Sequence, residues 1–221
     1  MKNIVLFGGG THLSYCIDII EKENKYKIVG ITDPNHEKGV SLFGYKVIGQ
    51  QENIKELINE YKIDSGIITI GDNWTRKIVY DKIVEIVPDF DFVSTIHPSV
   101  VIGKNVTIGK GTVIMAGCII SPNVKIGEFC FFATGAILEH DSFMDDFSSL
   151  SAGSVTGGKV KIGKFSAITL GVTIFDRIEI GEHSVIGSGS LVTKDVPSYV
   201  LAYGSPAKII RKREAGEKYL K

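Results

Sequence analysis

Residues 96–132 carry the pattern that decides the fold: IHPSVVIGKNVTIGKGTVIMAGCIISPNVKIGEFCFF. Every sixth residue counted from Ile96 is large and apolar as far as Val192, with Thr156 as the one exception. We call these the lead positions, and the residue four places after each is small or β-branched. An α-helix repeats every 3.6 residues and a strand every 2.0, so neither holds this period. The repeat therefore predicts a prism of short strands, a parallel β-helix with the lead side chains stacked inside.

Glycine often follows the lead position, as at Gly103 and Gly109. We expect it there because the turns between strands need permissive backbone dihedrals. The repeat keeps its phase throughout, which indicates that no long loop interrupts the column. Cys118 and Cys130 fall at small inward positions of the repeat, so both thiols are expected in the core.

Residues 1–94 show a different pattern, in which apolar strands alternate with helical spacing. Residues 4–7 form an apolar run that ends at Gly8-Gly9-Gly10, which is typical of a buried parallel strand and a tight turn. Further elements are expected as a helix around 13–20, a strand at 28–31, a helix at 51–61, a strand at 66–70, a helix around 78–86 and a short last strand at 90–93. Such alternation predicts a small parallel sheet covered by helices. We expect a half-Rossmann-like α/β domain over 1–94, an all-β column over 95–203, and a C-terminal tail or helix over 204–221.

Composition argues against several kinds of partner. Among 221 residues, Lys and Arg number 25 and Asp and Glu also number 25, so the basic excess of a nucleic-acid binder is missing. No run of about eighteen apolar residues is present, so no membrane span is expected. The N-terminal apolar run lacks a small-residue cleavage site, and we interpret it as a strand rather than a signal peptide. The three cysteines lack metal-ligand spacing, which fits reduced thiols in a cytoplasmic protein.

Four short motifs accompany the repeat: Leu6-Phe7-Gly8-Gly9-Gly10-Thr11-His12, Thr32-Asp33-Pro34, Ile70-Gly71-Asp72-Asn73 and Glu139-His140-Asp141. With them the chain resembles the hexapeptide-repeat acyltransferases that have a left-handed β-helix. Within these it is similar to the nucleotide-sugar N-acetyltransferases of the bacillosamine and perosamine type, grouped with the sialic acid O-acetyltransferases. The resemblance implies the left hand of the coil, a homotrimer with clefts between neighbouring columns, and acetyl-CoA as donor. It also implies direct transfer to an amine of a nucleotide-linked sugar, usually at carbon 4 of a 6-deoxy sugar.

His140 is the candidate general base. It lies two places after the lead residue Leu138, at an outward or corner position of its coil. Acetyl transfer needs a base because an ammonium has no lone pair, and imidazole titrates close to neutral pH. Asp141 or Glu139 beside the ring can fix its tautomer, and the resemblance implies Asp141, although relatives usually have glutamate there. The alternative is a solvated surface histidine.

The resemblance places the acetyl-CoA site along Ser149, Gly158, Leu170 and Ser188. Ser149 stands where relatives commonly have a second histidine, and its hydroxyl can still donate one hydrogen bond, at shorter reach. Backbone amides are the alternative donors to the thioester carbonyl. Gly158 and Ser188 can equally be ordinary corner residues. The basic residues that can meet the CoA phosphates, or else form the solvated end of a C-terminal helix, are Lys208, Arg211, Lys212 and Arg213.

The glycines after the first strand precede a helix, the right context for contact with a phosphate or ribose. Leu13 replaces the third glycine of a dinucleotide fingerprint, and the domain has half the usual size, so one nucleotide is expected rather than NAD. Asp33 lies where a ribose-binding acid would be, and His12 can reach the acceptor or cap the helix. Pro34 stands where relatives can have another acidic residue, so the sequence does not determine which nucleobase is bound. The residues expected to bind the acceptor are Gly10, Thr11, His12, Asp33, Pro34 and Gly71.

Three functions remain open at the level of sequence. The first is N-acetylation of a 4-amino-4,6-dideoxysugar linked to UDP, GDP or dTDP, with His140 as base. The same machinery could O-acetylate a free sugar such as sialic acid, or the chain could be a catalytically silent, trimeric nucleotide-binding module. No metal is expected, because the close histidine pair of the zinc-dependent β-helix enzymes is absent.

Overall fold

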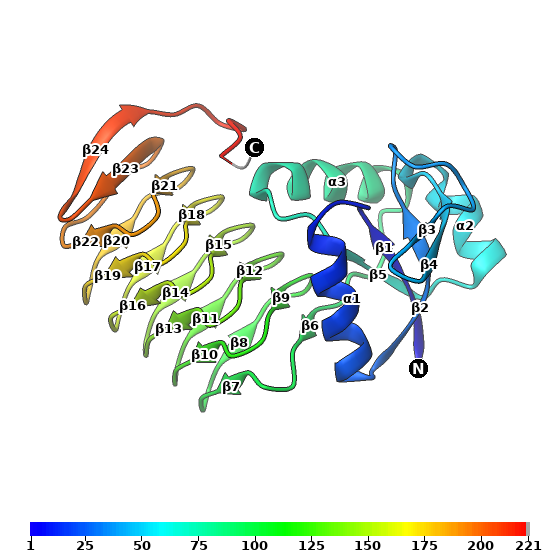
Figure 1. Cartoon of the computed structure of the whole chain (residues 1–221), viewed down its shortest axis with the longest axis horizontal. Coiled ribbons are helices and arrows are strands. Elements are labelled where there is room, and N and C mark those ends of the chain that lie inside the picture. Colours follow the sequence, from blue (N-terminus) through cyan, green and yellow to red (C-terminus); the bar gives the residue numbers. More distant parts are fainter. Residues whose placement is uncertain (220–221) are drawn as a thin grey trace.

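The computed structural model describes residues 1–219 and places an α/β domain beside a three-sided column of strands (Figure 1). The elements of the domain are β1 (Lys2–Phe7), α1 (His12–Glu23), β2 (Tyr26–Thr32), β3 (Ser41–Leu42), β4 (Tyr45–Gly49), the 3-10 helix η1 (Gln51–Asn53), α2 (Ile54–Tyr61), β5 (Ser65–Ile68) and α3 (Asn73–Ile86). The sheet order is β3-β4-β2-β1-β5, and only β3 is antiparallel to its neighbour. The strands and helices predicted for this part of the sequence are present, except that the short strand predicted at 90–93 is reduced to a single bridge between Phe92 and Gly66.

The hairpin of β3 and β4 was not predicted. Leu42 pairs with Tyr45 across a turn in which Phe43 and Gly44 have positive φ. β3 has only two residues and lies outside any repeat, so no periodicity in the sequence reveals it. β4 joins the sheet through long-range pairing of Val47 with Ile31 of β2.

The column consists of two-residue strands that form three sheets, one on each side of the prism. The domain-facing sheet contains β6 (Thr95–Ile96), β9 (Val113–Ile114), β12 (Phe131–Phe132), β15 (Ser149–Leu150), β18 (Ala167–Ile168) and β21 (Val185–Ile186). The sheet that we call apolar contains β7 (Val101–Ile102), β10 (Ile119–Ile120), β13 (Ile137–Leu138), β16 (Val155–Thr156), β19 (Thr173–Ile174) and β22 (Leu191–Val192). The sheet that we call charged contains β8 (Thr107–Ile108), β11 (Lys125–Ile126), β14 (Phe143–Met144), β17 (Lys161–Ile162) and β20 (Glu179–Ile180).

Each lead residue is the second residue of its strand, and from Ile114 to Val192 the lead side chains are buried. Cys118 and Cys130 belong to the same core. The predicted parallel β-helix is therefore confirmed. Thr156, the exception in the repeat, is buried as well, and its hydroxyl accepts a hydrogen bond from the backbone N–H of Glu139 at 3.0 Å.

Glycine is required after the lead positions for a different reason from the one expected. Gly103 and Gly109 are not among the residues with positive φ. A Cβ atom on Gly103 would lie 2.5 Å from the nitrogen of Pro122 in the next coil, so close stacking of the backbones excludes a side chain. Left-handed dihedrals fall two places later in each repeat, at every sixth residue from Asn105 to Gly189.

A tail or helix was expected over 204–221, and residues 204–219 contain no helix. The chain forms β23 (Val200–Gly204) and β24 (Ala207–Lys212), an antiparallel pair that continues the domain-facing sheet beyond β21. The last coil of the column offers an open strand edge, and pairing satisfies the backbone groups that a helix would have satisfied internally.

Two contacts fasten the α/β domain to the column. Helix α1 packs its apolar side against the domain-facing sheet, where Met115 and Phe131 join its core. Helix α3 contributes Arg76, which is fully buried and donates to the carbonyl oxygens of Phe129 and Phe147. The two parts therefore share buried surface. None of the helices within residues 1–219 combines the length and apolar character of a membrane span.

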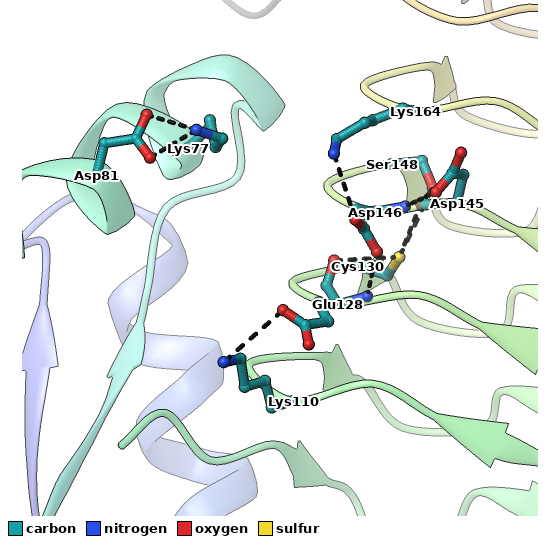
Figure 2. Close-up of polar contacts among 9 residues, drawn as sticks. All are labelled: Lys77, Asp81, Lys110, Glu128, Cys130, Asp145, Asp146, Ser148 and Lys164. Atoms are coloured by element: carbon teal, nitrogen blue, oxygen red, sulfur yellow. Dashed lines mark hydrogen bonds and ion pairs between the residues drawn. The ribbon is translucent and has the colours of Figure 1, made fainter. Parts of the chain in front are cut away.

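The corner between the charged and domain-facing sheets carries a ladder of charged side chains (Figure 2). Lys110 pairs with Glu128 at 3.9 Å, and Lys164 pairs with Asp146 at 3.3 Å. The carboxylate of Asp146 also accepts from the backbone N–H of Glu128 at 2.8 Å. These contacts link successive coils, and exposed ion pairs of this kind contribute little to stability individually.

Candidate active site

A cavity of about 500 Å³ lies between the start of α1 and the domain-facing side of the column. Its wall on the α/β domain includes Thr11, His12 and Gly71. The opposite wall includes Ser149 and Leu170, and the cavity extends along the column to Ser188, Ala152 and Ala133. Residues that the sequence suggested for an acceptor and for acetyl-CoA are thus brought together. The small side chains along the column leave room for a narrow, flexible ligand such as a pantetheine arm.

The domain side of the cavity forms where β1 and β5 end. These strands are neighbours, but the chain leaves β1 for α1 and β2 and returns to β5 on the other side, so the sheet has a switch point here. Ligands of open α/β sheets bind at such points. The His12 ring contacts the Phe131 ring, and a Cβ atom on Gly71 would lie 2.2 Å from His12 Cε1. Burial, with a smaller contribution from the Arg76 charge, lowers the pKa of His12 and so favours the neutral ring.

Asp33, Pro34 and Gly10 are not among the residues that line the cavity. The Asp33 carboxylate accepts hydrogen bonds from the backbone N–H of Gly9 at 2.6 Å and from that of Asn35 at 2.8 Å. Its Oδ1 atom also lies 2.8 Å from His36 Nδ1. Burial raises the pKa of Asp33, but these hydrogen bonds outweigh it and leave the pKa lowered. Asp33 therefore holds the glycine turn in place, and a ribose would have to share this carboxylate.

His140 lies on the far edge of the apolar sheet from the cavity. Its Nδ1 atom is 2.9 Å from Oδ2 of Asp141, whose other oxygen accepts from Asn123 Nδ2 at 3.0 Å. These hydrogen bonds, that of His140 first, lower the pKa of Asp141. An ionised carboxylate can only accept, so Nδ1 carries the proton and Nε2 is free to take another. Gly158 lies behind the ring, where a Cβ atom would be 2.5 Å from Nε2.

The apolar sheet separates the cavity from His140. Its outward side chains include Val101, Ile119, Ile137, Val155 and Leu191. On the charged sheet the equivalent positions hold Thr107, Lys125, Lys161 and Glu179, all exposed, with Phe143. Thr173 of β19 interrupts this series between Val155 and Leu191. The outward side chains from Val101 to Val155 form an apolar stripe on four successive strands, which is typical of a contact surface.

Tyr219 is a functional candidate that sequence reasoning missed, and Asn73 is a structural contact that it missed. The Tyr219 ring lines the cavity, and its hydroxyl lies 3.1 Å from the hydroxyl of Ser149. Asn73, at the start of α3, donates to the carbonyl oxygens of Phe165 and Ser166. No spacing in the sequence connects Tyr219 with Ser149, because the contact depends on how the C-terminal segment folds back. Among residues 1–219, no cluster of three or more histidine, cysteine or carboxylate side chains has the arrangement of a metal site.

Both parts of the chain match known families. Residues 3–83 match the PglD N-terminal domain, and residues 105–140 match the bacterial transferase hexapeptide of six repeats. UDP-N-acetylbacillosamine N-acetyltransferase from Bacillus subtilis is 31% identical over 118 residues. That match covers 52% of each protein, so it spans about half the length of the curated relative.

Solved structures match over nearly the whole chain. A histidine-to-asparagine variant of perosamine N-acetyltransferase from Caulobacter crescentus, in complex with CoA and GDP-perosamine, has 28% identity and a TM-score of 0.89 over 96% of this chain and 98% of that one. The acetyltransferase domain of PglB from Neisseria gonorrhoeae, in complex with acetyl coenzyme A, shares the fold at 23% identity, with a TM-score of 0.85 over 95% and 99% of the two chains. The fold and cavity define a left-handed β-helix acyltransferase with an added α/β domain. Within that class the chain is similar in sequence and structure to the hexapeptide-repeat sugar acetyltransferases of the bacillosamine and perosamine type.

Proposed function

We propose that the protein transfers the acetyl group of acetyl-CoA to the 4-amino group of a nucleotide-linked 4-amino-4,6-dideoxysugar. The single observation that supports this most strongly is the cavity, in which Thr11, His12 and Gly71 face Ser149 and Leu170. One ligand can approach from the switch point of the α/β sheet and another along the column. The perosamine enzyme of similar fold holds a nucleotide sugar and CoA together.

The reaction needs a proton acceptor near the amine. The amine nitrogen attacks the thioester carbonyl carbon, the carbon–sulfur bond breaks, and an amide and CoA are formed. In this proposal Nε2 of His140 takes the proton that the amine loses and returns it to the departing sulfur. The Asp141 carboxylate holds the ring in the required tautomer through the 2.9 Å contact at Nδ1. A positioned base of this kind contributes about 10²–10⁴-fold to turnover.

His140 must come from a neighbouring copy of the chain, because the apolar sheet separates it from the cavity of its own chain. We infer a homotrimer with three apolar sheets turned toward a common axis. The cavity borders one edge of this sheet and His140 borders the other, so rotation about the axis places His140 beside the next chain's cavity. In a cyclic trimer the three apolar sheets bury one another, and the ring closes without leaving an unpaired interface.

The decisive experiment is an acceptor panel for the full-length protein with acetyl-CoA, in which released CoA is measured with a thiol reagent. The panel contains UDP-, GDP- and dTDP-linked 4-amino-4,6-dideoxysugars, the same sugars without a nucleotide, and sialic acid. We expect CoA release with at least one nucleotide-linked amine and little with the unlinked amines. Turnover of sialic acid alone would instead establish O-acetylation. If no member of the panel raises CoA release above hydrolysis, the proposed transferase activity is wrong.

A further inference from the structure

The C-terminal residues 213–219, which we call the strap, return from the end of β24 to the α/β domain (Figure 1). The backbone N–H of Arg213 donates to the carbonyl oxygen of Tyr199 at 2.7 Å. The Arg213 side chain is almost completely buried and donates to the carbonyl oxygen of Glu217. Gly216 packs against Trp74, where a Cβ atom would lie 2.6 Å from the indole nitrogen. The strap is therefore held by a defined set of contacts.

These contacts bring Tyr219 into the cavity. Its hydroxyl lies 3.1 Å from Ser149 Oγ, 3.4 Å from the carbonyl oxygen of Gly71 and 3.5 Å from Asn73 Oδ1. Ser149 and Tyr219 belong to the lining of the same cavity, although Ser149 is only 3% exposed. Two hydroxyl groups from distant parts of the chain thus meet where the cavity wall on the α/β domain joins the cavity wall on the column.

The direction of the hydrogen bond follows from the neighbouring groups. Arg76 already donates to Gly71 O at 3.0 Å and to Asn73 Oδ1 at 2.9 Å. Each of these two oxygens therefore already accepts a hydrogen bond from Arg76, and each lies closer to Arg76 than to the Tyr219 hydroxyl. Ser149 Oγ is the nearest acceptor for the Tyr219 proton. If Tyr219 donates to Ser149, the single proton of Ser149 is free to point into the cavity.

We propose that Tyr219 is a positioning residue that donates to Ser149, so that the Ser149 hydroxyl donates in turn to the thioester carbonyl oxygen. This inference rests on the proposed acetyl transfer. The carbonyl oxygen gains negative charge as the amine attacks, and a donor fixed in advance stabilises that charge. A chain of two hydroxyls strengthens the terminal hydrogen bond by mutual polarisation. Burial raises the pKa of Tyr219, which keeps its hydroxyl protonated over the working pH range.

A double-mutant cycle with Ser149→Ala and Tyr219→Phe tests the proposal. We expect Ser149→Ala to lower kcat by roughly 10²-fold, and Tyr219→Phe by about tenfold, because it removes only the orienting partner. In the Ser149→Ala background, Tyr219→Phe should cause no further loss, because the hydroxyl that it orients is gone. KM for acetyl-CoA and the melting temperature should stay unchanged in Tyr219→Phe. The matched control is Tyr203→Phe, because Tyr203 lies on β23 and is 48% exposed.

Three results would overturn the inference: a Tyr219→Phe enzyme as active as the wild type, losses that multiply in the double variant, or a variant faster than the wild type. The last result would identify the strap as a gate that obstructs the cavity. The cycle is measured with an acceptor that the wild-type protein acetylates. Absence of wild-type turnover on every acceptor would refute the transferase proposal, whereas any of the three results above in an active enzyme refutes only the role of Tyr219.

Discussion

The Nε atom of Arg76 donates a hydrogen bond of 2.8 Å to the carbonyl oxygen of Phe129. The same guanidinium donates to the carbonyl oxygens of Ile70 and Gly71 in its own domain. Arg76 is 1% exposed, and within residues 1–219 it forms no ion pair with a carboxylate. Backbone carbonyls from both domains therefore surround this cation, and the cavity wall at Gly71 depends on it.

We expect Arg76→Met to destabilise the protein by about 2–4 kcal/mol. Methionine retains an apolar stem but leaves several buried carbonyl oxygens without a donor, and each unsatisfied group costs about 1–3 kcal/mol, partly offset by relaxation. The free energy of unfolding is measured by urea titration. Lys77→Met is the control, because Lys77 is the next residue on α3 and makes an ion pair with the half-exposed Asp81. A similar small change in both variants would show that the domains do not depend on Arg76.

The phase of the repeat predicts that an acidic substitution strongly destabilises the protein at one residue of β11 and has almost no effect at the adjacent residue. Ile126 is 4% exposed in the core of the column, whereas the Lys125 side chain points to solvent. Ile126→Asp should cost at least about 3 kcal/mol, because it buries a carboxyl group without a partner. Lys125→Asp should change stability by less than about 0.5 kcal/mol. Melting temperatures measured side by side check the prediction, and equal values would mean that the lead positions do not face inward.

His140→Ala should lower kcat by roughly 10²–10⁴-fold, as expected when a positioned base is lost, with little change in KM for acetyl-CoA. The loss should shrink as pH rises, because more of the sugar amine is then already deprotonated. Asp141→Asn should have a smaller effect, because the ring loses the ionised acceptor at Nδ1. The kinetics are measured with the best acceptor of the panel from pH 6 to pH 9. Full activity of His140→Ala across this range would exclude His140 as the base.

A shared site can be tested by mixing two inactive variants. His140→Ala removes the base, and Ala152→Trp fills the cavity along the column, which Ala152 lines. In mixed trimers from equal amounts of the two chains, about one quarter of the interfaces combine an intact His140 with an intact cavity. We therefore expect recovery of about a quarter of wild-type turnover after co-refolding. If each site lies within one chain, the mixture will stay inactive.

Acid should release the strap. The hydrogen bond from Arg211 lowers the pKa of Glu217 from 4.5 to about 2. Because the folded-state pKa is depressed, the contact stabilises the strap above about pH 4.5, and this stabilisation is lost as pH falls from there toward 2. Trp74 is the single tryptophan and contacts Gly216 of the strap, so its fluorescence should change in this window. Glu217→Gln should lack the transition, and circular dichroism must show that the column stays folded. An identical transition in the variant would assign the signal to another group.

The six-residue repeat predicted the column because it is a local property of the chain. Each lead side chain, such as Ile126, is buried by neighbours that the same repeat supplies one coil above and one coil below. No long-range information is needed to predict that Leu138 faces inward and that His140, two places later, does not. The resemblance similarly indicated Ser149, Gly158, Leu170 and Ser188 for acetyl-CoA. Three of them line one cavity, whereas Gly158 lies against the His140 ring instead.

Contacts between distant segments were decided only by the tertiary structure. Gly103 looked like a turn residue, but the backbone of the next coil excludes its side chain. The segment after Gly204 became a strand because the last coil presents an open edge. The pairing of Tyr219 with Ser149 spans 70 residues, and neither residue carries a local signal for the other. A repeat specifies its own stacking, whereas the return of a terminal segment depends on the whole surface against which it packs.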